Sequence, residues 1–214
     1  MGLVLGRVTV EQPKYTVVSS GANYEVREYP PAVVAEVKYE GAAYGKNQSD
    51  PFRTLAKYIG VFGNPENESK SKPESGEKIA MTAPVITETS DPTSDKVDGE
   101  KIAMTAPVIT ADSSSGSKKE SIMQFVLPEK YTMENAPKPK DSRVSIKELP
   151  ARKLGVIKFS GNTTEELTAQ KEKALREALE EAGLTVTGTP TLARYNPPFV
   201  PWFLKTNEVF LPVE

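Results

Sequence analysis

The chain has 214 residues, a formal net charge of −2, and neither cysteine nor histidine. A charge so close to balance predicts neither nucleic acid nor an acidic membrane as a partner. The missing residue types exclude disulfide bonds, thiolate and imidazole metal ligands, cysteine nucleophiles and histidine bases.

The first recognisable element is Tyr24–Gly41, YEVREYPPAVVAEVKYEG. Apolar and polar residues alternate on both sides of its proline corner, which predicts a pair of half-buried strands or one bent strand. A short helix should follow, because Asp50 is a good N-cap, Pro51 suits the first helical position, and Gly60 is a good terminator.

The next region contains the segment GEKIAMTAPVIT twice, at 76–87 and at 99–110. Solenoid folds need three or more repeats, so two copies indicate a local duplication within another fold. Polar stretches at about 61–77, 88–100 and 111–120 surround the copies and read as solvated loops.

Either copy can provide one strand before the strand expected at Ser121–Leu127. Loop-closure entropy favours the second copy by only about 0.3 kcal/mol, which is below RT. We expect Lys101–Thr110 to be the strand, since it leaves the tighter hairpin.

The second half repeats the first. Val144–Gly161, VSIKELPARKLGVIKFSG, aligns without a gap to Tyr24–Gly41 at an offset of about 120 residues in the printed numbering. A helix should begin near Asn162 and end at Gly183, followed by strands at Leu184–Tyr195 and Glu208–Val213. The chain therefore reads β-α-β-β twice, as one α+β domain over residues 1–214 with a pseudosymmetric curved sheet or barrel and two outer helices.

Five motifs occur in an order that resembles the SOUL haem-binding protein family, especially its plant-type cytosolic members. They are YEVREYPP, AKYIGVFG, KIAMTAPV, ARYNPP and TNEV, and the resemblance extends from about Pro13 to Glu214. The resemblance implies a distorted eight-stranded barrel flanked by two helices. It also implies reversible, non-catalytic binding of haem and related tetrapyrroles such as protoporphyrin.

Some members of that family are thought to ligate iron through histidine, which this chain lacks. The mode that remains is burial of the macrocycle in an apolar groove, with basic side chains paired to its propionates. Met81 and Met104 are candidate iron ligands by chemistry, but methionine in an apolar strand is usually core, and we expect no resident metal site.

Two basic residues share one face of the first helix, Arg53 and Lys57. Lys57 matches the family lysine that faces a propionate. Arg53 does not occupy the family's arginine position, which is Ser49 here, but it lies one turn before Lys57. The alternative is that both are ordinary solvated charges.

The segment Tyr195–Leu204 combines three prolines with four aromatic residues, so it cannot be a central strand. We expect a rigid loop in which Phe199, Trp202 and Phe203 cover a flat apolar ligand, unless these rings close the barrel end as core. Lys205 is the candidate for the basic residue that the family carries in this loop.

The functional prediction is a soluble cytoplasmic monomer that buffers or carries haem and delivers it to an accepting protein, with no membrane partner, because no apolar stretch or N-terminal targeting signal is present. Sequestration of another planar small molecule and a role as a protein-interaction module remain open as alternatives.

Overall fold

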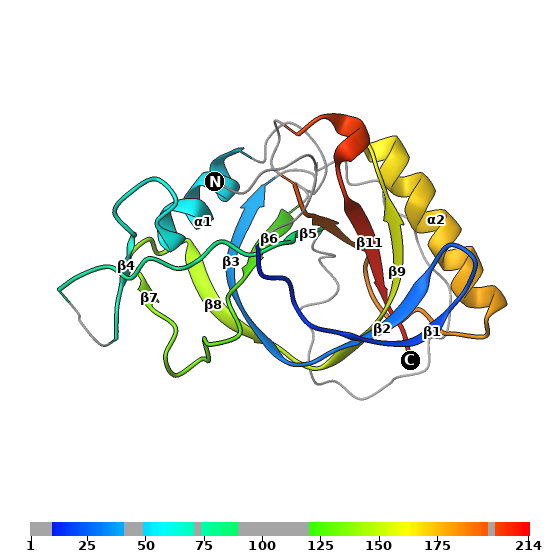
Figure 1. The fold of residues 1–214 in the computed structure, drawn as a ribbon, viewed down its shortest axis with the longest axis horizontal. Helices are drawn as coiled ribbons and strands as arrows, with labels where there is room; N and C mark the ends of the chain where they lie inside the picture. The colour runs from blue at the N-terminus through cyan, green and yellow to red at the C-terminus, as the bar shows by residue number, and fades with distance from the viewer. Residues whose placement is uncertain (1–9, 41–48, 71–73, 90–119, 197–199) are drawn as a thin grey trace, which may run out of the picture.

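The computed structural model describes residues 10–40, 49–70, 74–89, 120–196 and 200–214 (Figure 1). The first half contains an edge strand, the two strands predicted around Pro30–Pro31, the first helix and two further strands. Their bounds are β1 Thr16–Ser20, β2 Glu25–Tyr29, β3 Ala32–Glu40, α1 Ser49–Ile59, β5 Val85–Thr89 and β6 Glu120–Val126. Because proline cannot donate a sheet hydrogen bond, Pro30–Pro31 divides the segment into two strands rather than one.

The second half has the same order of elements. Their bounds are β8 Val144–Leu149, β9 Arg152–Phe159, α2 Glu165–Glu181, β10 Thr191–Arg194, the 3-10 helix η1 Trp202–Leu204 and β11 Asn207–Pro212. The N-cap of α2 is Thr164 rather than Asn162, and its side chain accepts a hydrogen bond from the Leu167 amide. Gly183 follows the helix at a φ of 76°, which confirms the predicted glycine stop.

The strands form one antiparallel, curled sheet of nine strands in the order β1-β2-β9-β11-β10-β5-β6-β3-β8. The expected barrel had eight strands. The ninth strand is β1, which pairs with β2 at the edge of the sheet. β4 (Asn67–Glu68) lies inside the predicted loop at 61–77, and it pairs with β7 (Lys138–Pro139) as a small separate ribbon.

The pseudosymmetry predicted from the sequence is present in the register of the sheet. β2 pairs with β9 so that Glu25 lies opposite Val156, and β8 pairs with β3 so that Ser145 lies opposite Glu36. Ser145 is the repeat equivalent of Glu25, and Glu36 is the repeat equivalent of Val156. The two pairings are therefore related by the pseudosymmetry. The two halves of the chain also meet where β10 pairs with β5.

The predicted choice between the two copies is wrong, because β5 belongs to the first copy. Val85–Thr89 pairs with β6 on one side and with β10 on the other. The sequence preference was smaller than RT, and the first copy is followed by Glu88, which accepts a hydrogen bond from the Thr189 hydroxyl. The second copy is followed by Ala111, which cannot make this bond. Residues 99–110 lie outside the described part of the chain.

The two helices pack against the outer face of the curl (Figure 1). Leu55, Tyr58 and Ile59 of α1 join the outward side chains of β3 and β6 in one buried cluster, which we call the α1-side cluster. Leu175 and Leu179 of α2 pack against β9 and β11 in another. Within the residues that the structure describes, no helix is long and apolar enough to cross a membrane.

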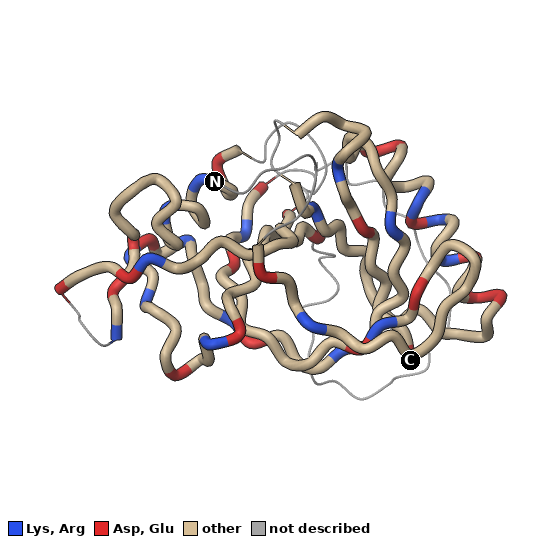
Figure 2. The backbone as a smooth tube through the Cα atoms, in the orientation of Figure 1, with Lys and Arg blue, Asp and Glu red and all other residues tan. Residues whose placement is uncertain are grey.

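The inner face of the curl carries a mixture of apolar and charged side chains. Leu154, Val156 and Phe210 are buried there, as are Val34 and Val126. Along the described part of the backbone, acidic and basic residues are interspersed without an extended region of one sign (Figure 2).

Candidate functional site

The basic pair on α1 is exposed, as its spacing predicts. Arg53 and Lys57 point away from the buried face of the helix, which is anchored by the Tyr58 hydroxyl donating to the Pro137 carbonyl at 2.9 Å. The Lys57 ammonium lies 3.2 Å from the Glu66 carboxylate, and both side chains are about half exposed. A ligand anion at Lys57 would therefore compete with Glu66.

The aromatic turn before β11 is built around η1. Trp202 and Phe203 are 62% and 59% exposed, and their rings meet edge to face with centroids 5.8 Å apart. This exposure argues against the alternative that these two rings are core.

The turn is held by contacts to the start of α2 rather than by its own rings. The Gly161 amide donates to the Trp202 carbonyl at 3.1 Å, and the Lys205 ammonium donates to the Asn162 side chain at 3.0 Å. Val200 is buried beneath it. Phe199 lies outside the described residues, so its predicted role stays a prediction.

The structure thus assembles the predicted residues as two groups, α1 with Arg53 and Lys57, and the turn with Trp202, Phe203 and Lys205. Among the described residues, no hydrogen bond, ion pair or ring contact joins α1 to η1. Whether one ligand bridges the two groups is a question for experiment.

Sequence reasoning missed Arg194 and Tyr39, which belong to the outer face of the sheet. The Arg194 guanidinium donates to the Thr87 hydroxyl at 3.5 Å, and Thr87 lies in register with Met123 of the α1-side cluster. Burial raises the pKa of Tyr39, and the nearby charge of Arg194 opposes this rise. The alternation of β10, in which Leu192 and Arg194 share a face, was the available signal.

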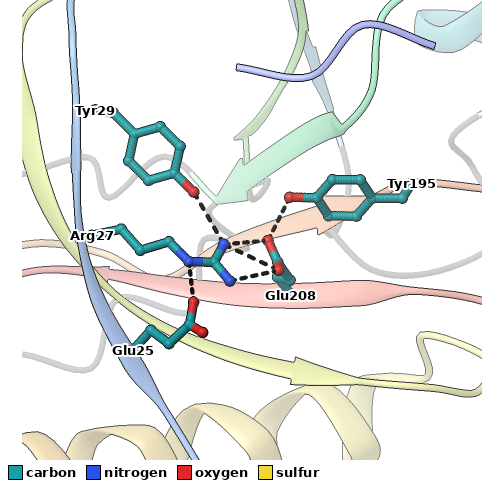
Figure 3. A network of polar contacts seen from close by, with 5 residues as sticks. All are labelled: Glu25, Arg27, Tyr29, Tyr195 and Glu208. Atoms are coloured by element: carbon teal, nitrogen blue, oxygen red, sulfur yellow. Dashed lines mark hydrogen bonds and ion pairs between the residues drawn. The ribbon is translucent and has the colours of Figure 1, made fainter. Parts of the chain in front are cut away.

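A network of charged and phenolic groups lies on the inner face (Figure 3). The Arg27 guanidinium donates to Glu208 from both terminal nitrogens at 3.1 Å and to Glu25 from Nε at 2.7 Å. Tyr29 accepts from Arg27, Tyr195 donates to Glu208, and burial raises the pKa of Tyr29 to about 12. Because Arg27 and Glu208 are both buried and paired with each other, removing either one would leave the other charge buried without compensation.

In the described part of the chain, no group of acidic residues is arranged to hold a metal ion. Met81 is partly buried against the α1-side cluster, as expected for core, and Met104 lies outside the described residues. Two cavities lined by described residues have volumes of about 560 and 640 Å³. Their walls contain none of the predicted ligand residues.

Comparison with protein families gives one match, to the family described as "SOUL heme-binding protein", over residues 10–98 and 92–212. The chain belongs to the SOUL family. Each matched segment includes one copy of the duplicated sequence. A comparison with curated proteins gives no match.

Solved structures resemble this SOUL chain in fold alone. The C-terminal domain of EcmrR is 13% identical, with 94% of this chain and 98% of that one covered at a TM-score of 0.52. An uncharacterized conserved protein from Listeria innocua is 14% identical, with 90% and 92% covered at 0.57. A Listeria innocua protein described as a hydrolase is 13% identical, with 92% and 94% covered at 0.55.

The residues of this SOUL protein fit a haem held without histidine. Trp202 and Phe203 are exposed aromatic rings available to a macrocycle, and Arg53, Lys57 and Lys205 are cations available to its propionates. The iron would have no imidazole from this chain, because the sequence contains none.

Proposed function

We propose that the protein binds haem and related tetrapyrroles reversibly, without catalysis, and buffers or carries them in the cytoplasm. Family membership supports the ligand class. The observation that carries the site is the exposed Trp202–Phe203 pair, because two large neighbouring rings more than half exposed are unusual unless they contact something.

Trp202 and Phe203 would supply most of the binding free energy. Packing a macrocycle against these rings removes apolar area from water at about 25 cal/mol per Å². Phe199 is the third ring proposed for this contact. The fixed attachment of the turn at Gly161 and Asn162 lowers the entropic cost of presenting the rings.

Arg53, Lys57 and Lys205 would orient the ligand through its propionates. Exposed ion pairs of this kind contribute about 0.2–1 kcal/mol each. The contribution of Lys57 is reduced further, because its ammonium must exchange Glu66 for the ligand. Arg53 has no such competitor among the described residues, so it is the stronger of the two α1 candidates.

Haem bound in this way supplies its iron as cargo, not as a catalytic centre. With no histidine in the chain, the iron would stay weakly ligated or unligated. A loosely held ligand suits transfer to an accepting protein. We expect the carrier to act as a monomer and to bind no nucleic acid.

Hemin titration with two simultaneous readouts tests the proposal. Absorption in the Soret region reports binding, and fluorescence reports the position of the ligand, because Trp202 is the sole tryptophan of the chain. We expect saturable binding with strong quenching of Trp202. Stoichiometric binding that leaves this emission unquenched would move the site away from the turn, and absence of saturable binding would reject haem as the ligand.

A further inference from the structure

A cavity of about 640 Å³ lies on the inner face of the curled sheet, on the opposite side of the strands from α1 and α2. Its size is within the range of small-molecule sites. Strands β5, β6, β8, β9, β10 and β11 and the segment before β10 form its walls. The lining includes Ile86, Leu149, Leu154, Val186, Phe210 and Pro212 on its apolar side.

The polar part of the lining consists of Arg152, Glu88, Gln124 and the threonines Thr187, Thr189 and Thr191. Arg152 begins β9, and its Nη1 is fully buried without a hydrogen-bond partner in the structure. An unpaired buried donor costs about 1–3 kcal/mol, and more when it is charged. Burial accordingly lowers the pKa of this guanidinium.

Two other cations of the inner face, Arg27 and Lys147, are paired. Arg27 has Glu25, Glu208 and Tyr29 as acceptors, and Lys147 lies 2.6 Å from Glu36. Arg152 has the Tyr29 ring 5.7 Å from its Cζ, but among the described residues it forms no ion pair with a carboxylate. Arg152 Nη1 therefore lacks a hydrogen-bond acceptor, which a bound anion would supply.

Glu88 is the carboxylate that shares the cavity, and it is engaged elsewhere. It accepts the Thr189 hydroxyl hydrogen bond, and its electrostatic interaction with Arg152 acts from beyond contact distance. Gln124 likewise donates to Glu36 at 2.8 Å. Among the described lining residues, Arg152 therefore retains a buried donor, Nη1, without a hydrogen-bond partner.

We propose that this cavity binds a small organic anion, with one carboxylate on Arg152 and an apolar body against Leu154, Phe210 and their neighbours. A guanidinium offers parallel donors that match a carboxylate. The site is separate from the proposed haem surface and does not depend on it.

Isothermal titration calorimetry with decanoate tests the site in the full-length protein. Decan-1-ol and decylammonium serve as probes with the same chain and a neutral or positive head. We expect saturable binding of decanoate and at least tenfold weaker binding of the other two. Tighter binding of decylammonium would identify Glu88 as the recognising group and overturn the proposal.

Variants assign the binding to Arg152. Arg152→Met should weaken decanoate at least tenfold, and Arg152→Lys should retain part of the affinity. Lys153→Met is the matched control, because it removes the same charge at the next position of β9, where the side chain points to the other face. Glu88→Gln should tighten decanoate by a few-fold, since it removes a like charge.

Three further outcomes would overturn the proposal. These are no saturable decanoate binding, unchanged binding in Arg152→Met, and equal losses in Arg152→Met and Lys153→Met. Hemin titration of Arg152→Met separates the two sites, because we expect unchanged hemin affinity. A protein that fails to bind hemin but binds decanoate would reject only the proposed haem function.

Discussion

A single-copy variant gives the sharpest test of how the duplicated segment is used. Deleting residues 76–98 joins Ser75 to Gly99 and leaves one GEKIAMTAPVIT, and deleting 88–110 produces the same protein. The remaining copy can repeat the β5 pairing with β6 and β10 through the residues equivalent to Val85–Thr87, whereas Ala111 and Asp112 take the places of Glu88 and Thr89.

The expected change in stability is a small difference between two terms. The connection from β5 to β6 shortens from roughly 30 residues to about seven, which stabilises the fold by about 1.3 kcal/mol through loop-closure entropy. Replacement of Glu88 by Ala111 removes the hydrogen bond from Thr189, which costs about 1 kcal/mol. At about 2–4 °C per kcal/mol for a chain of this size, the melting temperature should change by less than about 4 °C.

Thermal unfolding followed by circular dichroism measures this change. The matched control is Ala111→Glu in the single-copy chain, which restores a carboxylate at the Glu88 position and should recover its share of stability. A loss of more than about 10 °C would show that the second copy contributes contacts of its own.

An isoleucine substitution in each background tests whether the copies are interchangeable. Ile86 is buried between Val34 and Val126, and removing such a side chain costs about 2–5 kcal/mol. In the single-copy chain, Ile109→Ala should carry this full cost. In the full chain, Ile86→Ala should cost only about 1 kcal/mol, because the intact second copy can take the strand position. Equal losses would refute interchangeability, and Ile109→Ala in the full chain should be silent.

Four further predictions concern the outer surface and the cavity. Lys57→Ala should weaken hemin about two- to fivefold, more at low salt than at high salt, as measured by Soret titration. Trp202→Phe should retain most hemin affinity, whereas Trp202→Ala should lose about tenfold with little salt dependence. Imidazole added to the hemin complex should bind the iron readily and sharpen the Soret band, since no internal imidazole competes; a sharp low-spin spectrum before addition would contradict this. Burial raises the pKa of Glu88 above 4.5, so the native protein holds this proton to higher pH than the unfolded chain and loses stability as pH rises through that window. The melting temperature of Glu88→Gln relative to wild type should therefore increase between pH 4 and pH 7.

The sequence was informative where local chemistry decides structure. The proline corners and the alternation around them predicted β2, β3, β8 and β9. The offset between the repeats predicted that the two halves are equivalent, and the matching registers of β2 with β9 and of β8 with β3 confirm this. Exposure of Lys57 followed from helical spacing. These features depend on neighbours in the chain, which a sequence displays directly.

The features that sequence reasoning missed depend on distant partners. β1 is exposed along its whole length, so no alternation marks it, and it becomes a strand only by pairing with β2. The choice of the first copy involves Thr189, about a hundred positions from Glu88. The pairing of Lys57 with Glu66 needs the return of the chain after α1, which helical periodicity does not reveal.

The pseudosymmetry offers a way to separate scaffold from specialised residues. Positions that match across the repeats serve the sheet in both halves, as Arg27 and Lys147 do by pairing with Glu208 and Glu36. Arg152 departs from this rule, because the equivalent residue of the first half is Ala32. A fold that needs only alanine at this position gains nothing structural from a guanidinium whose buried Nη1 has no partner. Arg152→Ala should therefore cost less stability than Arg27→Ala, which leaves Glu208 buried without its partner. Chemical denaturation of the two variants decides the point, and a larger loss for Arg152→Ala would mean that Arg152 is part of the scaffold.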